Sequence, residues 1–283
     1  MYLIFLFVCG FLLVRVSLSL IINLLIDASI VDKNYRGETV PAALGLVFPL
    51  VLPFLFLFYY GLKFFSVPIE INSGEFFAFL FFTTGFGLLG LADDFLKNNH
   101  EKGFRQHLTM LWQGKLTSGG LKALFGLLFS LIFAVGVWLS TGQRWWLLFP
   151  HTLVGALAPN IVNLFDLRPG RAIKVFLLGL VILLLSSYLS KGVNPMLYLS
   201  APVLGGVLAY FPLDLKGRGM LGDTGANFLG GVFGGLVILE GSILLWIILL
   251  IFVVLQIIAE KISFTKLIEK YSFLKFFDDL GRD

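Results

Sequence analysis

Residues 76–94 read FFAFLFFTTGFGLLGLADD, a largely apolar run that ends in the adjacent carboxylates of Asp93 and Asp94. No lysine or arginine precedes them within the run, so nothing there neutralises their charge. A helix of about 20 apolar residues crosses the hydrocarbon core of a bilayer. The stretch therefore predicts a transmembrane helix with an acidic end, where carboxylates are costly unless something binds them.

The rest of the chain continues this pattern. Of its 283 residues, 58% are hydrophobic and 13% are charged, which leaves more apolar surface than a soluble domain could bury. Apolar runs predict about nine spans, near residues 2–23, 43–65, 75–92, 119–139, 145–162, 173–190, 196–212, 225–240 and 242–260. We therefore expect an all-α, polytopic membrane helix bundle over residues 1–262. The first run lacks a basic start and a cleavage site, so we expect it to be retained.

The stretch 263–283 differs from the bundle because its apolar side chains recur every three or four residues between charged ones. The apolar members are Leu267, Ile268, Tyr271, Leu274 and Phe277. This spacing predicts an amphipathic cytoplasmic helix. It would lie on the inner leaflet or against the bundle, or else cover the functional site.

Basic residues are divided unevenly between the two predicted sides of the membrane. If odd-numbered spans end in the cytoplasm, only Lys63, Arg144 and Lys191 fall outside. The cytoplasmic side collects Lys33, Arg36, Lys97, Lys102, Arg105, Lys115, Lys122, Arg168, Arg171, Lys174, Lys216, Arg218, Lys261, Lys266, Lys270, Lys275 and Arg282. Because short Lys- and Arg-rich loops stay in the cytoplasm, we expect the N-terminus outside a bacterial inner membrane and the C-terminus inside. The net charge of +4 follows from this bias and does not imply nucleic-acid binding.

Three polar clusters lie at the predicted cytoplasmic face, and the first is the pair Asp93 and Asp94. Adjacent carboxylates can hold a divalent cation, or one can act as a base beside it. A solvated pair that marks the end of a helix is the simpler alternative.

The second cluster contains Asn160, Asn163 and Asp166, which recur every three residues and so share one face of a helix. Two amides and a carboxylate in line could bind a sugar or a metal that carries phosphate. They could equally form hydrogen bonds across helices within the bundle.

The third cluster is GDTGAN, from Gly222 to Asn227, which follows a loop with Lys216 and Arg218. Small residues let backbone N–H groups approach a phosphate at a helix N-terminus, and Asp223 offers a hard oxygen ligand for Mg²⁺. A Gly-Asp turn that caps the helix is the alternative.

The predicted topology brings the three clusters to one membrane face. Acidic metal ligands beside basic phosphate ligands suit phosphoryl transfer, in which positioning and charge neutralisation do most of the catalysis. The single cysteine, Cys9, excludes a cysteine-based metal site. The histidines His100, His107 and His151 are expected to be solvated or structural.

In their order and spacing, three motifs resemble those of the polyprenyl-phosphate N-acetylhexosamine-1-phosphate transferase superfamily. They are Leu91-Ala-Asp93-Asp94, Asn160-Ile-Val-Asn163-Leu-Phe-Asp166 and Gly222-Asp223-Thr-Gly225. The resemblance extends to the early loop with Lys33 and Arg36, which is followed by Pro41 and Gly45. Members of this superfamily include phospho-N-acetylmuramoyl-pentapeptide transferase and undecaprenyl-phosphate N-acetylglucosamine-1-phosphate transferases.

The resemblance implies that a membrane-bound polyprenyl phosphate attacks the β-phosphate of a UDP-sugar and releases UMP, with Mg²⁺ bridging the diphosphate. It implies catalytic roles for Asp93, Asp94 and Asp166, and metal binding by Asp223 and Asp94. Substrate binding falls to a larger set of polar residues: Lys33, Arg36, Asn160, Asn163, Arg168, Arg171, Lys216, Arg218, Gly222 and Asn227.

Two departures from the family pattern concern the donor. The family usually continues Gly-x-Asp-Gly after the loop carboxylate, whereas this chain reads Leu167-Arg168-Pro169-Gly170. Its tail also lacks the family's histidine motif and final span. Arg168 and Arg171 flank the stiff Pro169 and could grip a phosphate bidentately. The alternative is that they anchor the loop at lipid headgroups.

Our leading hypothesis is a Mg²⁺-dependent phosphoglycosyl transferase that uses undecaprenyl phosphate and a nucleotide sugar, such as a UDP-N-acetylhexosamine, in cell-envelope or peptidoglycan synthesis. The main alternative is a catalytically lapsed homologue that binds lipid phosphate or a partner protein as a membrane scaffold. A secondary transporter is less favoured, because Arg15 alone lies well inside a span. The bundle would contact membrane lipids and could pair as a homodimer.

Overall fold

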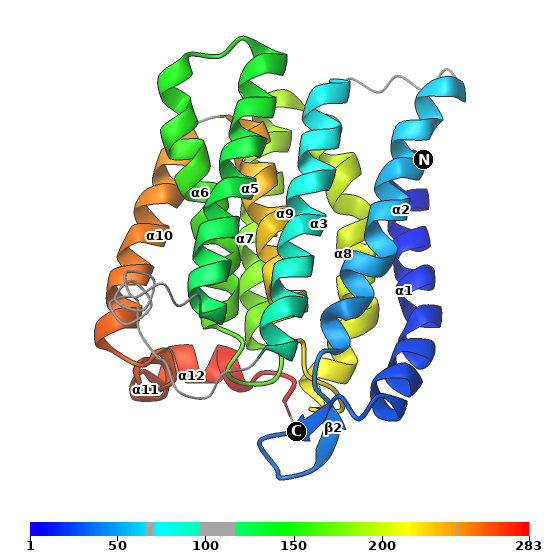
Figure 1. Cartoon of the computed structure of the whole chain (residues 1–283), viewed down its shortest axis with the longest axis vertical. Coiled ribbons are helices and arrows are strands. Elements are labelled where there is room, and N and C mark those ends of the chain that lie inside the picture. Colours follow the sequence, from blue (N-terminus) through cyan, green and yellow to red (C-terminus); the bar gives the residue numbers. More distant parts are fainter. Residues whose placement is uncertain (66–70, 97–116, 242, 283) are drawn as a thin grey trace.

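The computed structural model describes residues 1–65, 71–96, 117–241 and 243–282, and long helices dominate it (Figure 1). Within these residues, nine segments are long and apolar enough to cross a membrane, which confirms the expected all-α polytopic bundle. The helices that form them are α1 (Tyr2–Asp27), α2 (Val47–Gly61), α3 (Ser73–Phe95), α5 (Ser118–Thr141), α6 (Leu148–Leu164), α7 (Arg171–Lys191), α8 (Pro195–Leu215), α9 (Gly222–Glu240) and α10 (Ile243–Lys261). Short 3₁₀ turns extend two of them: η1 (Leu44–Leu46) and η2 (Leu62–Phe65) flank α2, and η3 (Trp145–Leu147) leads into α6.

Helix α9 lies at the centre of the bundle, where it packs against α3 and α6 and is the most buried of the candidate spans. Glycines allow this close packing, because a Cβ at Gly90 of α3 would overlap the backbone of Asp223 and Thr224. A Cβ at Gly230 of α9 would likewise overlap the backbone of Pro159 in α6. Small residues let transmembrane helices approach in this way, and here they bring the polar ends of α3, α6 and α9 together.

A two-stranded hairpin covers one end of the bundle, and the sequence pattern did not predict it. Strand β1 (Val31–Lys33) pairs antiparallel with β2 (Thr39–Pro41), with Val31 opposite Pro41. The Pro41 carbonyl oxygen accepts a hydrogen bond from the Met220 N–H, at 2.8 Å, and so ties the hairpin to the loop before α9.

The tail was expected to form a single amphipathic helix, and this prediction was wrong. It forms two short helices, with a break between them at Tyr271. These are α11 (Phe264–Lys270) and α12 (Ser272–Asp279), which lie across the same end of the bundle as the hairpin (Figure 1). Phe264 and Ile268 of α11 are buried, whereas Phe273 and Phe276 of α12 are exposed. The apolar contact of the tail with the bundle is therefore made by α11, while α12 keeps an exposed apolar face.

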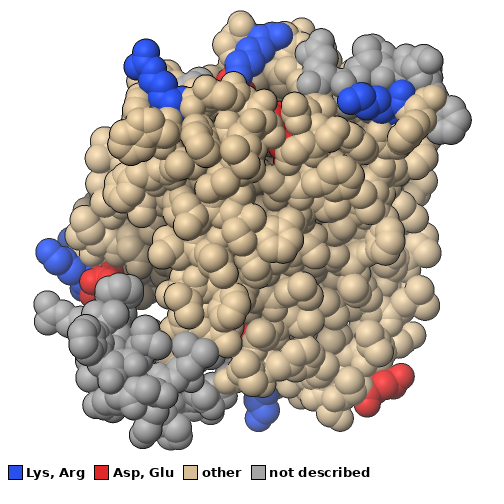
Figure 2. All heavy atoms as spheres, turned by 45° about the horizontal axis from the view of Figure 1, so that its top comes forward, with Lys and Arg blue, Asp and Glu red and all other residues tan. Residues whose placement is uncertain are grey.

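On one face of the molecule, charged side chains lie away from the broad middle of the surface. Figure 2 shows a wide, almost uncharged band on the visible face, with Lys and Arg toward its ends. This is the surface expected of a bundle that contacts lipid. The expected loop with His100 and His107, together with Lys97, Lys102, Arg105 and Lys115, lies outside the described residues.

Candidate active site

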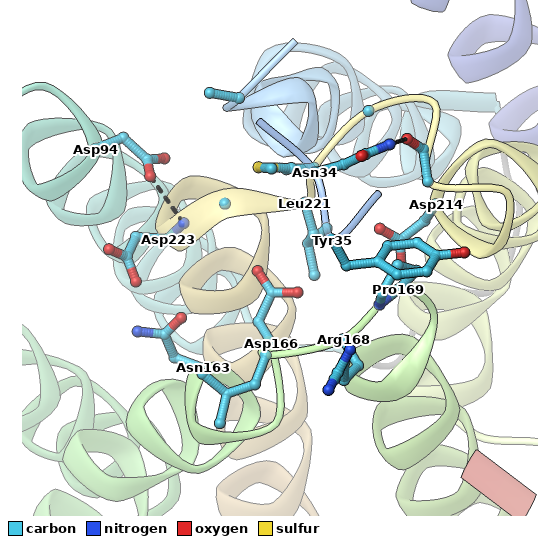
Figure 3. A pocket seen from close by; sticks show the side chains of 16 residues that line it. Asn34, Tyr35, Asp94, Asn163, Asp166, Arg168, Pro169, Asp214, Leu221 and Asp223 are labelled. Atoms are coloured by element: carbon cyan, nitrogen blue, oxygen red, sulfur yellow. Dashed lines mark hydrogen bonds between the residues drawn. The ribbon is translucent and has the colours of Figure 1, made fainter. Parts of the chain in front are cut away.

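A pocket of about 260 Å³ opens at the end of the bundle that carries the hairpin and the tail (Figure 3). Most of its lining comes from the hairpin, the loop between α6 and α7, and the N-terminal end of α9 with the loop before it. The ends of α3, α6 and α8 add Asp94, Asn163 and Asp214. Its polar side chains are Asn34, Tyr35, Asp94, Asn163, Asp166, Arg168, Asp214 and Asp223. The pocket thus combines four carboxylates with a guanidinium group.

Asp94, at the end of α3, binds the N-terminus of α9. Its Oδ1 accepts a hydrogen bond from the Asp223 N–H at 3.0 Å, and its Oδ2 accepts from the Thr224 N–H at 2.9 Å and the Thr224 hydroxyl at 2.6 Å. A carboxylate in this position satisfies unpaired N–H groups and complements the positive end of the helix dipole. Asp94 therefore fixes where α9 begins, and with it the position of Asp223.

Asp166 occupies the centre of the pocket, between Asn163 and Asp223 on one side and Arg168 on the other (Figure 3). Burial raises the pKa of its carboxyl well above the usual range, and the negative charges of Asp214, Asp223 and Asp94 raise it further. A backbone hydrogen bond from Gly222 offsets this only in part. Ionised Asp166 is thus energetically costly until a cation enters the pocket.

Lys122, in the first turns of α5, bridges two of the acidic residues. Its Nζ lies 3.4 Å from Asp93 Oδ2 and 3.5 Å from Asp223 Oδ1. All three side chains are partly buried, so this pair of contacts is screened less than an exposed one would be. Asp93 is thereby joined to the pocket, although its own side chain does not line it.

The donor set fits a magnesium ion that is held jointly with a substrate. In the part of the chain that the structure describes, no three histidine, cysteine, aspartate or glutamate side chains converge on one metal position. Mg²⁺ is, however, usually bound by one or two carboxylates plus substrate phosphates rather than by an all-protein cage. Asp223 and Asp166, with hard oxygens facing the same cavity, are the side chains that could hold it.

Six of the residues singled out in the sequence line this pocket together: Asp94, Asn163, Asp166, Arg168, Gly222 and Asp223. Four basic candidates stand beside it without lining it. Lys33 and Arg36 are exposed on the hairpin around Asn34 and Tyr35, and Lys216 and Arg218 are exposed on either side of Gly217. These neighbours do line the pocket, so the four cations lie near its rim.

Three expected substrate contacts take other positions. Asn160 donates a hydrogen bond to Gln256 Oε1 of α10, at 2.6 Å, which is the cross-helix alternative considered above. Asn227 is fully buried inside the bundle rather than in the pocket lining. Arg171 is 3% exposed and forms a bidentate pair with Asp278 of the tail, so the predicted phosphate fork of Arg168 and Arg171 is corrected to Arg168 alone.

Sequence reasoning missed other residues of the site. Asp214 is a buried carboxylate at the end of α8 whose Oδ2 accepts the Gly170 N–H at 2.8 Å. An acidic residue at the end of an apolar span was the available signal, as it was for Asp94. Asn34 donates to the Gly217 carbonyl oxygen at 2.9 Å and holds the hairpin over the pocket. It belongs to the early loop that shares in the family resemblance, but no role was predicted for it.

Residues 76–241, more than half of the chain, match a family profile described as glycosyl transferase family 4. A phospho-N-acetylmuramoyl-pentapeptide-transferase from Acetivibrio thermocellus is 27% identical over 254 residues, which cover 82% of this chain and 69% of that protein. A protein of the same name from Pelobacter propionicus is 29% identical over 212 residues, which cover 65% of this chain and 58% of that protein. The matched family segment contains Asp94, Asp166 and Asp223 but neither the hairpin nor the tail.

Proposed function

Because this chain belongs to glycosyl transferase family 4, we propose that it moves a sugar-1-phosphate from a nucleotide sugar to undecaprenyl phosphate in a Mg²⁺-dependent reaction. At the family level, the chain is a multi-pass membrane transferase of the polyprenyl-phosphate phospho-sugar type, related to enzymes of cell-wall synthesis. The donor, the metal and the acceptor are the parts that we propose.

The proposal rests mainly on four carboxylates that line one pocket: Asp94, Asp166, Asp214 and Asp223. Their mutual repulsion is relieved by a divalent cation, and a diphosphate alone would be repelled from such a site. A complex of Mg²⁺ with a nucleotide diphosphate sugar removes both difficulties, because the cation neutralises protein carboxylates and substrate phosphates together.

In the proposed reaction, an oxygen of the acceptor phosphate forms a bond to the β-phosphorus of the donor. The bond from that phosphorus to the bridging oxygen breaks, and UMP leaves with the electron pair. When bound, Mg²⁺ would supply Lewis-acid chemistry at the diphosphate.

The chain's own residues would orient the reactants. Asp166 and Asp223 offer ligand oxygens, and Asp94 holds the α9 N-terminus in register with them. Asn163 and Arg168, on opposite sides of Asp166, would bind the donor (Figure 3). Lys122 would place a positive charge between Asp93 and Asp223, where phosphate charge must be accommodated.

We further propose that the pocket faces the cytoplasm of a bacterial inner membrane, where nucleotide sugars are made. The basic residues of the hairpin and of the loop before α9 lie at the pocket end of the bundle, as the positive-inside rule requires for a cytoplasmic face.

The assay for this function is UMP release by the purified chain in proteoliposomes. We expect release from one member of a panel of UDP-N-acetylhexosamines, UDP-N-acetylmuramoyl-pentapeptide included, only when both undecaprenyl phosphate and Mg²⁺ are present. UMP release that does not depend on the lipid acceptor would contradict the proposal.

The catalytically lapsed scaffold is the second candidate. Pro169 in the pocket lining favours it, because Pro169 stands where the family resemblance leads us to expect a second carboxylate. A scaffold would retain binding of lipid phosphate without turnover. Titration of undecaprenyl phosphate into the same proteoliposomes, together with the UMP assay, separates the two readings: binding with no UMP for any donor would select the scaffold.

A further inference from the structure

The C-terminal tail is attached to the protein through a buried ionic contact. Arg171 donates from Nε and Nη2 to the two carboxylate oxygens of Asp278, both at 2.7 Å, and from Nη1 to the Thr265 hydroxyl at 3.0 Å. Arg171 and Asp278 are 3% and 9% exposed. Two parallel hydrogen bonds between planar charged groups fix geometry as well as contributing energy.

Two more cations hold the end of α12 in the same place. Lys174 donates to the carbonyl oxygens of Phe277 and Asp278, at 3.0 and 2.6 Å, where the last carbonyls of α12 lack helical partners. Arg282 donates from Nη2 to Asp278 Oδ1 at 3.0 Å. Although burial raises the pKa of the Asp278 carboxyl, the hydrogen bonds from Arg171 and Arg282 lower it to about 2, so Asp278 is ionised at neutral pH. We call the cluster of Asp278 with Arg171, Lys174 and Arg282 the tail clamp.

The tail clamp contacts the loop that carries Asp166. Arg171 is the first residue of α7, directly after the loop, and Arg282 Nε donates to the Pro169 carbonyl oxygen at 3.2 Å. On its other side, the same loop is held by the hydrogen bond from the Gly170 N–H to Asp214. The loop residues Asp166, Leu167, Arg168 and Pro169 all line the pocket, so the tail and Asp214 together determine where these side chains lie.

We propose that the C-terminal tail is a working part of the active site, with Asp278 and Arg282 as positioning residues that hold the Asp166 loop in its substrate-binding position. Neither residue lines the pocket, so we assign both a positioning role and not a direct contact with substrate. The tail lies outside the matched family region. It thus supports a loop that reads Leu167-Arg168-Pro169-Gly170 where the family usually has Gly-x-Asp-Gly.

The first test measures the loop directly and does not depend on turnover. In Asp278→Asn, the acceptor for Arg171 loses its charge, and hydrogen exchange of full-length protein in nanodiscs should become faster for peptides covering residues 165–171. Peptides of α3 and α9 should be unchanged. The matched control is Glu269→Gln, which breaks the exposed Arg168–Glu269 contact of 3.8 Å on the same tail and should leave exchange in the loop unaltered. Faster exchange in the tail with an unchanged loop would overturn the proposal.

The second test rests on the proposed function and separates positioning from mere stabilisation. For Asp278→Asn, we expect the donor KM or the Mg²⁺ requirement to rise about 10- to 100-fold, the usual effect of losing a residue that orients a ligand. Arg282→Gln removes the contacts of the guanidinium with Asp278 and with the Pro169 carbonyl oxygen but leaves Arg171 paired with Asp278. It should raise the same quantity, but by less. If both variants lower the fraction of folded protein but leave the donor KM and the Mg²⁺ requirement unchanged, the tail only stabilises the fold and the proposal is overturned. If the wild-type chain shows no turnover, the function fails while the exchange test still decides the role of the tail.

Discussion

Asp223 is the residue whose side chain is best placed to bind a metal without being needed for packing. Its carboxylate faces the pocket, and the side chain is 23% exposed. We expect Asp223→Asn to fold normally and to lower kcat/KM by roughly 100-fold or more, the scale for losing one group that stabilises developing charge. UMP release by size-matched, monodisperse protein measures this, with the exposed Asp27→Asn as the control. Normal turnover in Asp223→Asn would remove the proposed ligand.

Asp166 should make the protein sensitive to pH in the absence of metal. Because its pKa is raised by folding, the folded state binds the proton more tightly than the unfolded state does. Its ionisation therefore costs stability, and this cost grows as pH rises from the unfolded pKa near 4 to the raised folded pKa. We expect Asp166→Asn to raise Tm at neutral pH, and added Mg²⁺ to raise Tm in the wild type only. An Asn variant that is no more stable than the wild type at neutral pH would contradict this assignment.

At the scale of helices, the contact of α3 with α9 places the acidic residues. A Cβ at Gly90 would meet the backbone of Asp223 and Thr224, which has no side-chain freedom to move away. Gly90→Ala should therefore destabilise the protein by about 1–3 kcal/mol, as overpacked sites do, and should reduce activity in the molecules that remain folded. Gly61→Ala, at the end of α2 where nothing lies within 4 Å, is the matched control and should be neutral or slightly stabilising. Equal Tm values for the two variants would contradict the close contact.

The helices were predictable from sequence and much of the site was not, for a physical reason. Apolar runs are local, so the spans could be read along the chain, and the clusters of Asp94, Asp166 and Asp223 followed from their position at span ends. Pairings depend on residues far apart in sequence: Thr224 meets Asp94 130 positions away, and Arg171 meets Asp278 107 positions away. No local pattern separates an arginine that binds phosphate from one that binds a distant carboxylate.

For the whole molecule, the orientation in the membrane is a prediction that labelling can test. In a background with Cys9 replaced by serine, Lys270→Cys on the tail should react with an impermeant thiol reagent only from the cytoplasmic side. Val193→Cys, exposed between α7 and α8 at the opposite end, should react only from outside. The positive-inside distribution requires this pattern. Labelling of position 270 from outside would place the pocket on the wrong face for a nucleotide sugar.

The central claim is that the pocket transfers a sugar-1-phosphate, and the fate of the donor's β-phosphate tests it most directly. The chain, reconstituted with undecaprenyl phosphate and Mg²⁺, would be given a UDP-sugar radiolabelled in that phosphate. We predict that the label moves into the organic phase as a lipid-linked diphosphate sugar, in an amount equal to the unlabelled UMP released, and that Asp223→Asn abolishes this transfer. Label that stays in water for every donor tested, or that appears in UDP or inorganic phosphate, would contradict the account.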